Sequence, residues 1–204
     1  MRAAVGVPVA AATVVAALAG AYAPAAADVA ASRAGVCGGE RWAVKTMADP
    51  AARLVDLRPR STTVAALRRL HAPNELGARA RGVETTSYRV RARLLAFKLE
   101  EDGDIHLVVA DPQTGGTMIT EFPASYCTIE ARPRARRLMS RARQSLIRAC
   151  GSPSSTFFTS LGGVAIVSGV GFFDFQHGQF GVAPNAIELH PVLSFRSPRC
   201  SRAP

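Results

Sequence analysis

The sequence lacks the short motifs that identify most hydrolases and nucleotide-binding enzymes. Its 204 residues contain no Gly-x-Ser-x-Gly turn, which carries a serine nucleophile, and no His-Glu-x-x-His, the helical zinc motif. Gly169 and Gly171 are two residues apart but lack the context of a phosphate-binding loop. The sequence therefore names no reaction, and whether the protein is an enzyme stays open.

Lysine is also scarce, because only Lys45 and Lys98 occur among the 25 basic residues. With 15 acidic residues the net charge is +10 and the isoelectric point is about 10.7. Such a charge favours anionic partners, although an arginine-rich genome would give the same composition. Hydrophobic residues make up 48% of the chain, which excludes wholesale disorder, and the length fits one domain with appendages.

The amino-terminal residues carry no acidic side chain before Asp28. Arg2 supplies a positive charge, an Ala/Val-rich stretch follows, and three alanines precede Asp28, so we expect a signal peptide at 1–27, cleaved after Ala27. A retained membrane anchor is the alternative, but the stretch is mostly alanine and is broken by Pro8, Gly20 and Pro24. We expect a secreted, periplasmic or cell-envelope protein with no membrane span after cleavage.

All four cysteines follow the predicted cleavage site, and an even number in an exported chain indicates two disulfides. Metal ligation is the weaker interpretation, because there is no Cys-x-x-Cys pair. We expect Cys127 to pair with Cys150, bracketing one helix, and Cys37 to pair with Cys200, joining the chain ends.

The predicted mature chain divides into residues 28–84, an amino-terminal extension, and residues 85–200, a barrel domain. In the extension we expect a short strand at Arg41–Thr46, where polar and apolar residues alternate. Ser61 or Thr62 is expected to cap a helix that carries leucine and valine on one stripe.

Residues 85–200 alternate between polar and apolar in the manner of strands, with one helix between them. The expected strands are 86–99, 105–110, 117–122, 164–173 and 187–195, and the helix begins at Pro133 and ends at Cys150. The apolar phase shifts by one residue at Leu94–Leu95, which indicates a β-bulge.

The fold class is therefore mostly β with one or two helices. The order β-β-β-α-β-β, with a long bent first strand, is that of the OB-fold, a five-stranded barrel. A generic α+β sandwich is the alternative.

Histidines and carboxylates are expected to meet at one rim of this barrel. Asp104 and His106, like Glu188 and His190, are two residues apart and share a strand face. A divalent metal, the one cofactor considered, suits such mixed ligands, and His177 would join an enzymatic site. Alternatively, the two strand histidines are half-buried and hydrogen-bonded without a metal.

Two further groups are candidates for ligand binding. The loop from Asp174 to Asn185, with His177 and Gln179, mixes aromatic, amide and glycine residues, although Phe175 and Phe180 could instead anchor it. Arg89, Arg91 and Arg93 share one strand face and would retain phosphate polymers, although such rows are often merely solvated.

The segments Asp104-Ile-His-Leu-Val, Gly169-Val-Gly-Phe-Phe-Asp and the run from His177 to Leu193 resemble a group of small exported bacterial proteins of unassigned activity. The likeness extends over about residues 41–195 and is strongest in the last third. It implies a shared exported OB-fold-like domain with a similar loop, and no catalytic residue.

These observations lead to three expectations of function. The first is an exported module that binds an anionic or sugar-containing polymer, nucleic acid or glycan, across the second and third barrel strands. The alternatives are a metal-dependent phosphodiesterase or nuclease and a structural envelope protein without a ligand.

Overall fold

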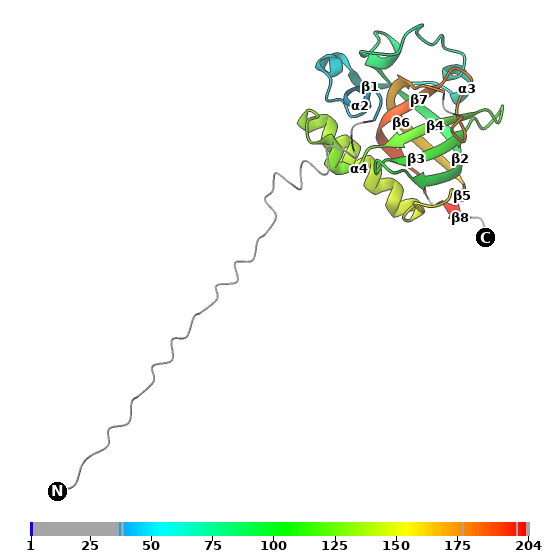
Figure 1. The fold of residues 1–204 in the computed structure, drawn as a ribbon. Coiled ribbons are helices and arrows are strands. Elements are labelled where there is room, and N and C mark those ends of the chain that lie inside the picture. Colours follow the sequence, from blue (N-terminus) through cyan, green and yellow to red (C-terminus); the bar gives the residue numbers. More distant parts are fainter. Residues whose placement is uncertain (2–36, 38, 177, 199, 203–204) are drawn as a thin grey trace.

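The computed structural model describes residues 1, 37, 39–176, 178–198 and 200–202. The predicted signal peptide, apart from Met1, and His177 lie outside the described residues. The described chain forms a barrel with α4 along one side and smaller elements around it (Figure 1).

Five strands close into a barrel, which confirms the OB-fold-like architecture. They are β2 (Thr86–Leu99), β3 (Ile105–Ala110), β4 (Thr117–Phe122), β6 (Val164–Phe173) and β7 (Ile187–Arg196). The strand order is β3-β4-β7-β6-β2, and β2 also pairs with β3, so the sheet closes. Only the β4–β7 pairing is parallel within this ring. The helix α4 (Pro133–Cys150) separates the third strand of the ring from the fourth in the chain.

The long first strand of the barrel bends at the predicted position. Its pairing with β3 shifts register between Leu94 and Ala96, which confirms the bulge expected from the change of apolar phase. Val90, Ala92 and Leu94 point into the core before the bulge. The bend allows β2 to pair with β6 along its first half and with β3 along its second half.

The helix α4 covers one side of the barrel with its apolar face. It begins at Pro133, where a missing N–H costs nothing, and ends at Cys150, followed by Gly151, whose φ of 81° suits glycine. Its buried residues are Ala135, Met139, Ala142, Leu146 and Cys150. No helix in the described part of the chain is long and apolar enough to cross a lipid bilayer.

Short elements surround the barrel. They are α2 (Trp42–Lys45), α3 (Val64–Leu67), the 3-10 helices η1 (Pro50–Leu54), η2 (Val83–Thr85) and η3 (Ser125–Thr128), and the strands β1 (Asp56–Ser61), β5 (Thr159–Gly162) and β8 (Ser201–Arg202). β1 pairs in parallel with the start of β2, and β5 pairs with β2 and β8. α3 confirms the helix expected in the extension, although its cap is Thr63, which accepts a hydrogen bond from Ala66 N–H.

The expected strand at 41–46 is wrong, because the chain forms the helix α2 there. Arg41 adopts a left-handed backbone conformation with φ of 54° and turns the chain into a single helical turn. Four residues are too few for alternation to distinguish a strand from one turn of helix, and only Val44 within α2 is buried.

The expected cysteine pairing is also wrong. The disulfides join Cys37 to Cys127 and Cys150 to Cys200, although all four cysteines are bonded as expected. A helix rises about 1.5 Å per residue, so the 18 residues of α4 separate the residues before and after it by about 27 Å. Disulfide-bonded Cα atoms lie about 4.4 to 6.8 Å apart, so a bond from Cys127 to Cys150 would require residues 127–132 to run back along most of the helix.

Candidate functional site

The histidines and carboxylates of the predicted rim lie on the outer face of the barrel. Ile187 and Leu189 of β7 point into the core, so the alternating Glu188 and His190 point outward. His106 on β3 is paired directly opposite Glu121 on β4. Because β3, β4 and β7 are neighbours in the ring, these side chains meet in one patch.

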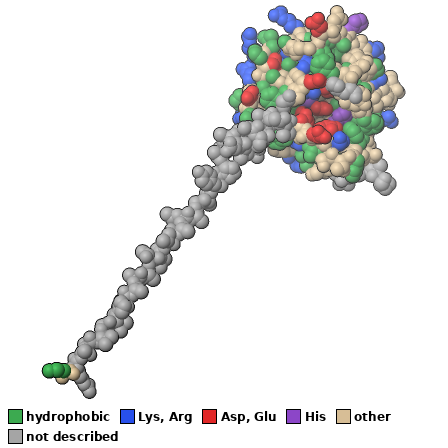
Figure 2. Space-filling view, viewed as in Figure 1, with side chains coloured by type: hydrophobic (Ala, Val, Ile, Leu, Met, Phe, Trp, Pro, Cys, Tyr) green, Lys and Arg blue, Asp and Glu red, His purple; other side chains and the backbone are tan. Residues whose placement is uncertain are grey.

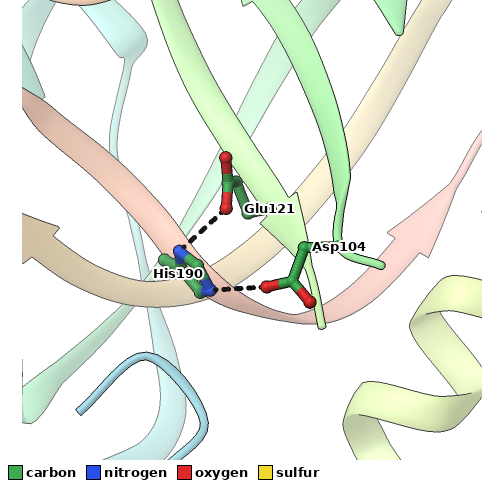
Figure 3. Close-up of side chains that lie close together, drawn as sticks. All are labelled: Asp104, Glu121 and His190. Carbon is green, nitrogen blue, oxygen red and sulfur yellow. Dashed lines mark ion pairs between the residues drawn. The ribbon is translucent and has the colours of Figure 1, made fainter. Parts of the chain in front are cut away.

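His190 lies between two carboxylates from different elements, Glu121 at the end of β4 and Asp104 just before β3 (Figure 3). Its Nδ1 is 3.2 Å from Glu121 Oε2 and its Nε2 is 3.4 Å from Asp104 Oδ2. Glu188 Oε2 lies 3.8 Å from the same Nδ1. We call Asp104, Glu121, Glu188 and His190 the carboxylate–histidine cluster.

Neighbouring groups hold the cluster in place. Asp104 Oδ1 accepts a hydrogen bond from Ala124 N–H at 2.8 Å, which fixes that carboxylate. His106 Nδ1 lies 3.5 Å from Glu121 Oε1, and its Nε2 lies 3.0 Å from the carbonyl oxygen of Phe180. The structure therefore brings together three of the four residues predicted as metal ligands, Asp104, Glu188 and His190. The fourth, His106, lies outside the cluster and contacts it through Glu121.

Burial gives the cluster unusual electrostatics. His190 is fully inaccessible to solvent, and neither of its ring nitrogens has a hydrogen bond of normal geometry. Glu188 Oε2 is buried and likewise lacks a hydrogen-bond partner. Buried polar atoms are nearly always hydrogen-bonded in proteins, so these atoms call for an explanation.

The pKa values of the cluster reflect both burial and charge. Burial alone would lower the pKa of His190, but Glu121, Asp104 and Glu188 raise it to about 10. Burial would raise the pKa of Glu121, but His190 and His106 lower it to about 2. Burial raises the pKa of Glu188 to about 7. A positive charge at His190 is therefore strongly favoured by its surroundings.

Basic residues from the amino-terminal extension lie beside the cluster. Lys45 Nζ is 3.0 Å from Asp174 Oδ2 and 5.5 Å from the centre of the Phe172 ring. The guanidinium of Arg41 lies 4.7 Å from the same ring, whose edge contacts His190. Figure 2 shows acidic side chains gathered over the end of β4, beside histidine and basic side chains.

The loop predicted to bind a ligand is folded onto the barrel. Gly181, with φ of 87°, lies so close to Val108 on β3 that a Cβ there would fall 2.3 Å from a methyl carbon. Asn185 Nδ2 donates hydrogen bonds to the carbonyl oxygens of Leu67 and Leu70. Gln179 Nε2 donates to the carbonyl of Phe175 in the same loop.

Consequently, the outer face of β3 is covered. Its outward residues His106, Val108 and Ala110 are at most 3% exposed. This is the face of the second and third barrel strands, where a polymer was expected to lie.

The three predicted strand arginines lie on a different part of the surface. Arg89, Arg91 and Arg93 are exposed on the outer face of β2, paired with Ser168, Ile166 and Val164 of β6. They contact neither the loop after β6 nor the carboxylate–histidine cluster in any described interaction. The predicted arginine row and the predicted metal ligands therefore lie in separate parts of the surface.

An open groove lies beside these arginines. It has a volume of about 840 Å³, and Arg91 of β2, Arg148 of α4 and Arg196 of β7 line it. We call this groove, with its three arginine side chains, the arginine groove. Among the described residues that line it, none is acidic.

Sequence reasoning missed Glu121, Arg41 and Lys45 as members of the buried site. Glu121 carried a usable signal, because it is an isolated charge at an outward position of an otherwise uncharged strand. Arg41 and Lys45 carried no such signal, because they reach the site through packing of the extension.

Comparisons with known proteins add nothing to this assignment. The site must therefore be interpreted from its own geometry, since no protein-family model, no curated protein and no solved structure matches the chain.

Proposed function

We propose that the protein is an exported module that binds an anionic polymer along its arginine surface. The observation that carries the proposal is the arginine groove. Three elements of the fold each supply one exposed guanidinium to it, and none of its described lining residues is a carboxylate. Arginine donors match phosphate and carboxylate oxygens in bidentate pairs. We therefore place the polymer at the arginine groove and not on the covered face of β3.

The surface of α4 extends this positive region. The sequence has no Asp or Glu from Ala131 to Phe173, and α4 carries six arginines within that span. Two further grooves, of about 520 and 410 Å³, flank the first half of α4. Arg132, Arg134 and Arg137 line one of them, and Arg136, Arg137 and Arg141 line the other.

These arginines are available for a ligand. Among residues that the structure describes, no carboxylate lies within ion-pair distance of an arginine on α4. Arg143 is partly buried and donates to the carbonyl of Phe122, whereas the other five are exposed. A polymer with regularly spaced negative charges fits such a track better than a single small anion does.

Export is part of the proposal. Two disulfides are typical of proteins from oxidising compartments, and the charge pattern of residues 1–27 supports a signal peptide. An exported cationic module would meet extracellular nucleic acid or acidic glycan. Single-stranded DNA is a practical test ligand, because its binding depends both on the positive charge of the protein and on the arginine groove.

The test measures binding of a fluorescent single-stranded oligonucleotide by anisotropy at several salt concentrations. The variant Arg91→Gln/Arg148→Gln/Arg196→Gln should bind at least about tenfold more weakly at low salt. Losing three phosphate contacts should reduce the slope of log affinity against log salt by about 2. An acidic polysaccharide in place of DNA tests whether the groove prefers phosphate.

A matched control separates the groove from net charge. Arg53, Arg69 and Arg81 are exposed on the extension, and their triple change to Gln removes the same charge. We expect this control to bind within about threefold of the wild type. An equal loss of affinity in both triple variants, or an affinity that does not change with salt concentration, would exclude the arginine groove as the binding surface.

A metal-dependent phosphodiesterase or nuclease is the second candidate, favoured by the carboxylate–histidine cluster. A catalytic metal needs an open coordination position for water or substrate, but the side chains of His190 and Glu188 are 0% and 2% exposed. We therefore expect no cleavage of the bound oligonucleotide, with or without added divalent metal. Cleavage that a chelator stops and His190→Asn abolishes would replace the binding module by the enzyme.

A further inference from the structure

We propose that the carboxylate–histidine cluster binds one divalent transition-metal ion, such as zinc, in a closed structural site. The donors are His190, Asp104 and Glu121, with Glu188 as the fourth side chain. This inference does not depend on polymer binding, because the arginine groove and the cluster share no residue.

The spacing of the donor atoms fits one ion. Single ligand atoms of Asp104, Glu121 and His190 lie within 4.8 Å of one another. Zinc binds nitrogen and oxygen at about 2.0 to 2.2 Å, which sets its ligand atoms about 3 to 4 Å apart. The oxygens of Glu121 and Glu188 lie 3.2 and 3.8 Å from His190 Nδ1, whereas that of Asp104 lies 3.4 Å from Nε2. An ion would bind one of these ring nitrogens, and side-chain rotation would bring the carboxylate from the other side of the ring to it.

The orphaned polar atoms are an independent sign of a missing partner. Both ring nitrogens of His190 and Glu188 Oε2 are buried without a hydrogen bond, and all three belong to the cluster. A metal ion would satisfy a ring nitrogen and a carboxylate oxygen together.

The surroundings determine the kind of metal and the kind of site. One imidazole with carboxylates suits zinc, manganese or iron better than calcium, which prefers six to eight oxygens. Burial leaves little room for substrate, so the ion would be structural. It would tie β7 to the end of β4 and to the residue before β3, beside the extension that carries Lys45.

A proton is the competitor for this position. Without an ion, His190 as imidazolium supplies positive charge between Glu121 and Asp104. Lys45 adds further positive charge nearby, from α2. The experiment must therefore distinguish an ion from a proton.

The test uses the complete oxidised mature chain, stripped with a chelator and titrated with zinc by calorimetry. We expect binding of about one zinc per chain, a melting temperature raised by at least about 5 °C, weaker binding of manganese and little binding of calcium. Cobalt binding should produce the visible absorption of a low-coordinate Co²⁺ site, which a proton cannot mimic and which needs no variant.

Variants locate the ion. His190→Asn and Glu121→Gln should each reduce zinc affinity at least about a hundredfold, while the exposed His71→Asn should not change it. Circular dichroism checks that each variant folds. If a variant does not fold, the cobalt spectrum of the wild type still tests for the metal site. Absence of zinc and cobalt binding by the wild type, or unchanged binding in both folded cluster variants, would overturn the proposal.

Discussion

At the scale of single residues, Asp111 is the clearest example of a buried charge with a structural task. Its Oδ2 accepts a hydrogen bond from Ala65 N–H at 2.9 Å, and its Oδ1 accepts from Gln113 and Thr114 N–H at 3.1 Å. The carboxylate thereby closes the turn between β3 and β4 and joins it to the first turn of α3. Its residue is 1% exposed, so water cannot replace these bonds.

Replacing Asp111 by Ala should lower the free energy of unfolding by about 2 to 3 kcal/mol, because three backbone N–H groups lose a charged acceptor. Burial alone would raise the pKa of Asp111, but the N–H groups of Ala65, Thr114 and Gln113 lower it below its ordinary value. A carboxyl whose folded pKa is lowered stabilises the fold above its unfolded pKa and loses that contribution as the pH falls.

Urea denaturation measures both effects. The difference between wild type and Asp111→Ala should be full at pH 7 and should shrink as the pH falls below about 4. Glu130→Ala, at an exposed position, is the control and should stay near the wild type throughout. A difference that does not depend on pH would mean that the charge of Asp111 is not what stabilises the turn.

At the scale of elements, the two disulfides hold different parts of the fold. Cys150 is the last residue of α4, and its bond to Cys200 joins the helix end to the carboxy-terminal segment before β8. The loop that it closes spans 50 residues, and such a bond typically contributes about 2 to 4 kcal/mol. The Cys150→Ser/Cys200→Ser variant should therefore unfold at lower urea concentration than the wild type, without reductant in either sample.

Peptide mapping of the oxidised protein provides the direct check of the pairing. Digestion should release Cys150 linked to Cys200, and Cys37 linked to Cys127. Recovery of Cys127 linked to Cys150 would contradict the described arrangement, as would an unchanged urea midpoint for the serine variant.

The sequence predicted those elements that are long enough to show a period. β3, β4 and β6 begin and end at the predicted residues, and α4 follows its apolar stripe. β5 and β8 are four and two residues long, so no pattern in the sequence could identify them. α2 was mistaken for a strand for the same reason, and the disulfide partners depend on three-dimensional distances that spacing alone does not give.

The candidate site was predictable only in part. Two-residue spacing placed Glu188 and His190 on one strand face, and the barrel topology brought Asp104 to them. Glu121 completes the cluster because β4 lies between β3 and β7, which follows from strand order and not from local pattern. The covering of β3 by the loop after β6 was not predictable, since Asn185 and Gly181 act through contacts far away in the sequence.

At the scale of the whole molecule, the extension and the barrel are bonded through buried charges. Glu84 is fully buried, and its carboxylate accepts hydrogen bonds from the Arg41 guanidinium at 2.7 and 2.8 Å. It also accepts from Phe173 N–H at the end of β6, at 3.0 Å. Arg79 is paired with Asp49 inside the extension and donates to the carbonyl of Glu84. The extension is therefore an integral part of the fold.

We therefore predict that the extension and the barrel unfold in one transition and that Glu84→Gln destabilises both together. The substitution keeps the size of the side chain but leaves the buried Arg41 charge without its partner, which typically costs about 3 to 5 kcal/mol. Scanning calorimetry should show a single peak in wild type and variant, shifted to lower temperature in the variant. Glu75→Gln, which removes an exposed charge from the same extension, should leave the peak in place. If Glu84→Gln instead produced a separate low-temperature transition followed by an unshifted main peak, the extension would be an independent appendage, and its basic residues would not be fixed beside the carboxylate–histidine cluster.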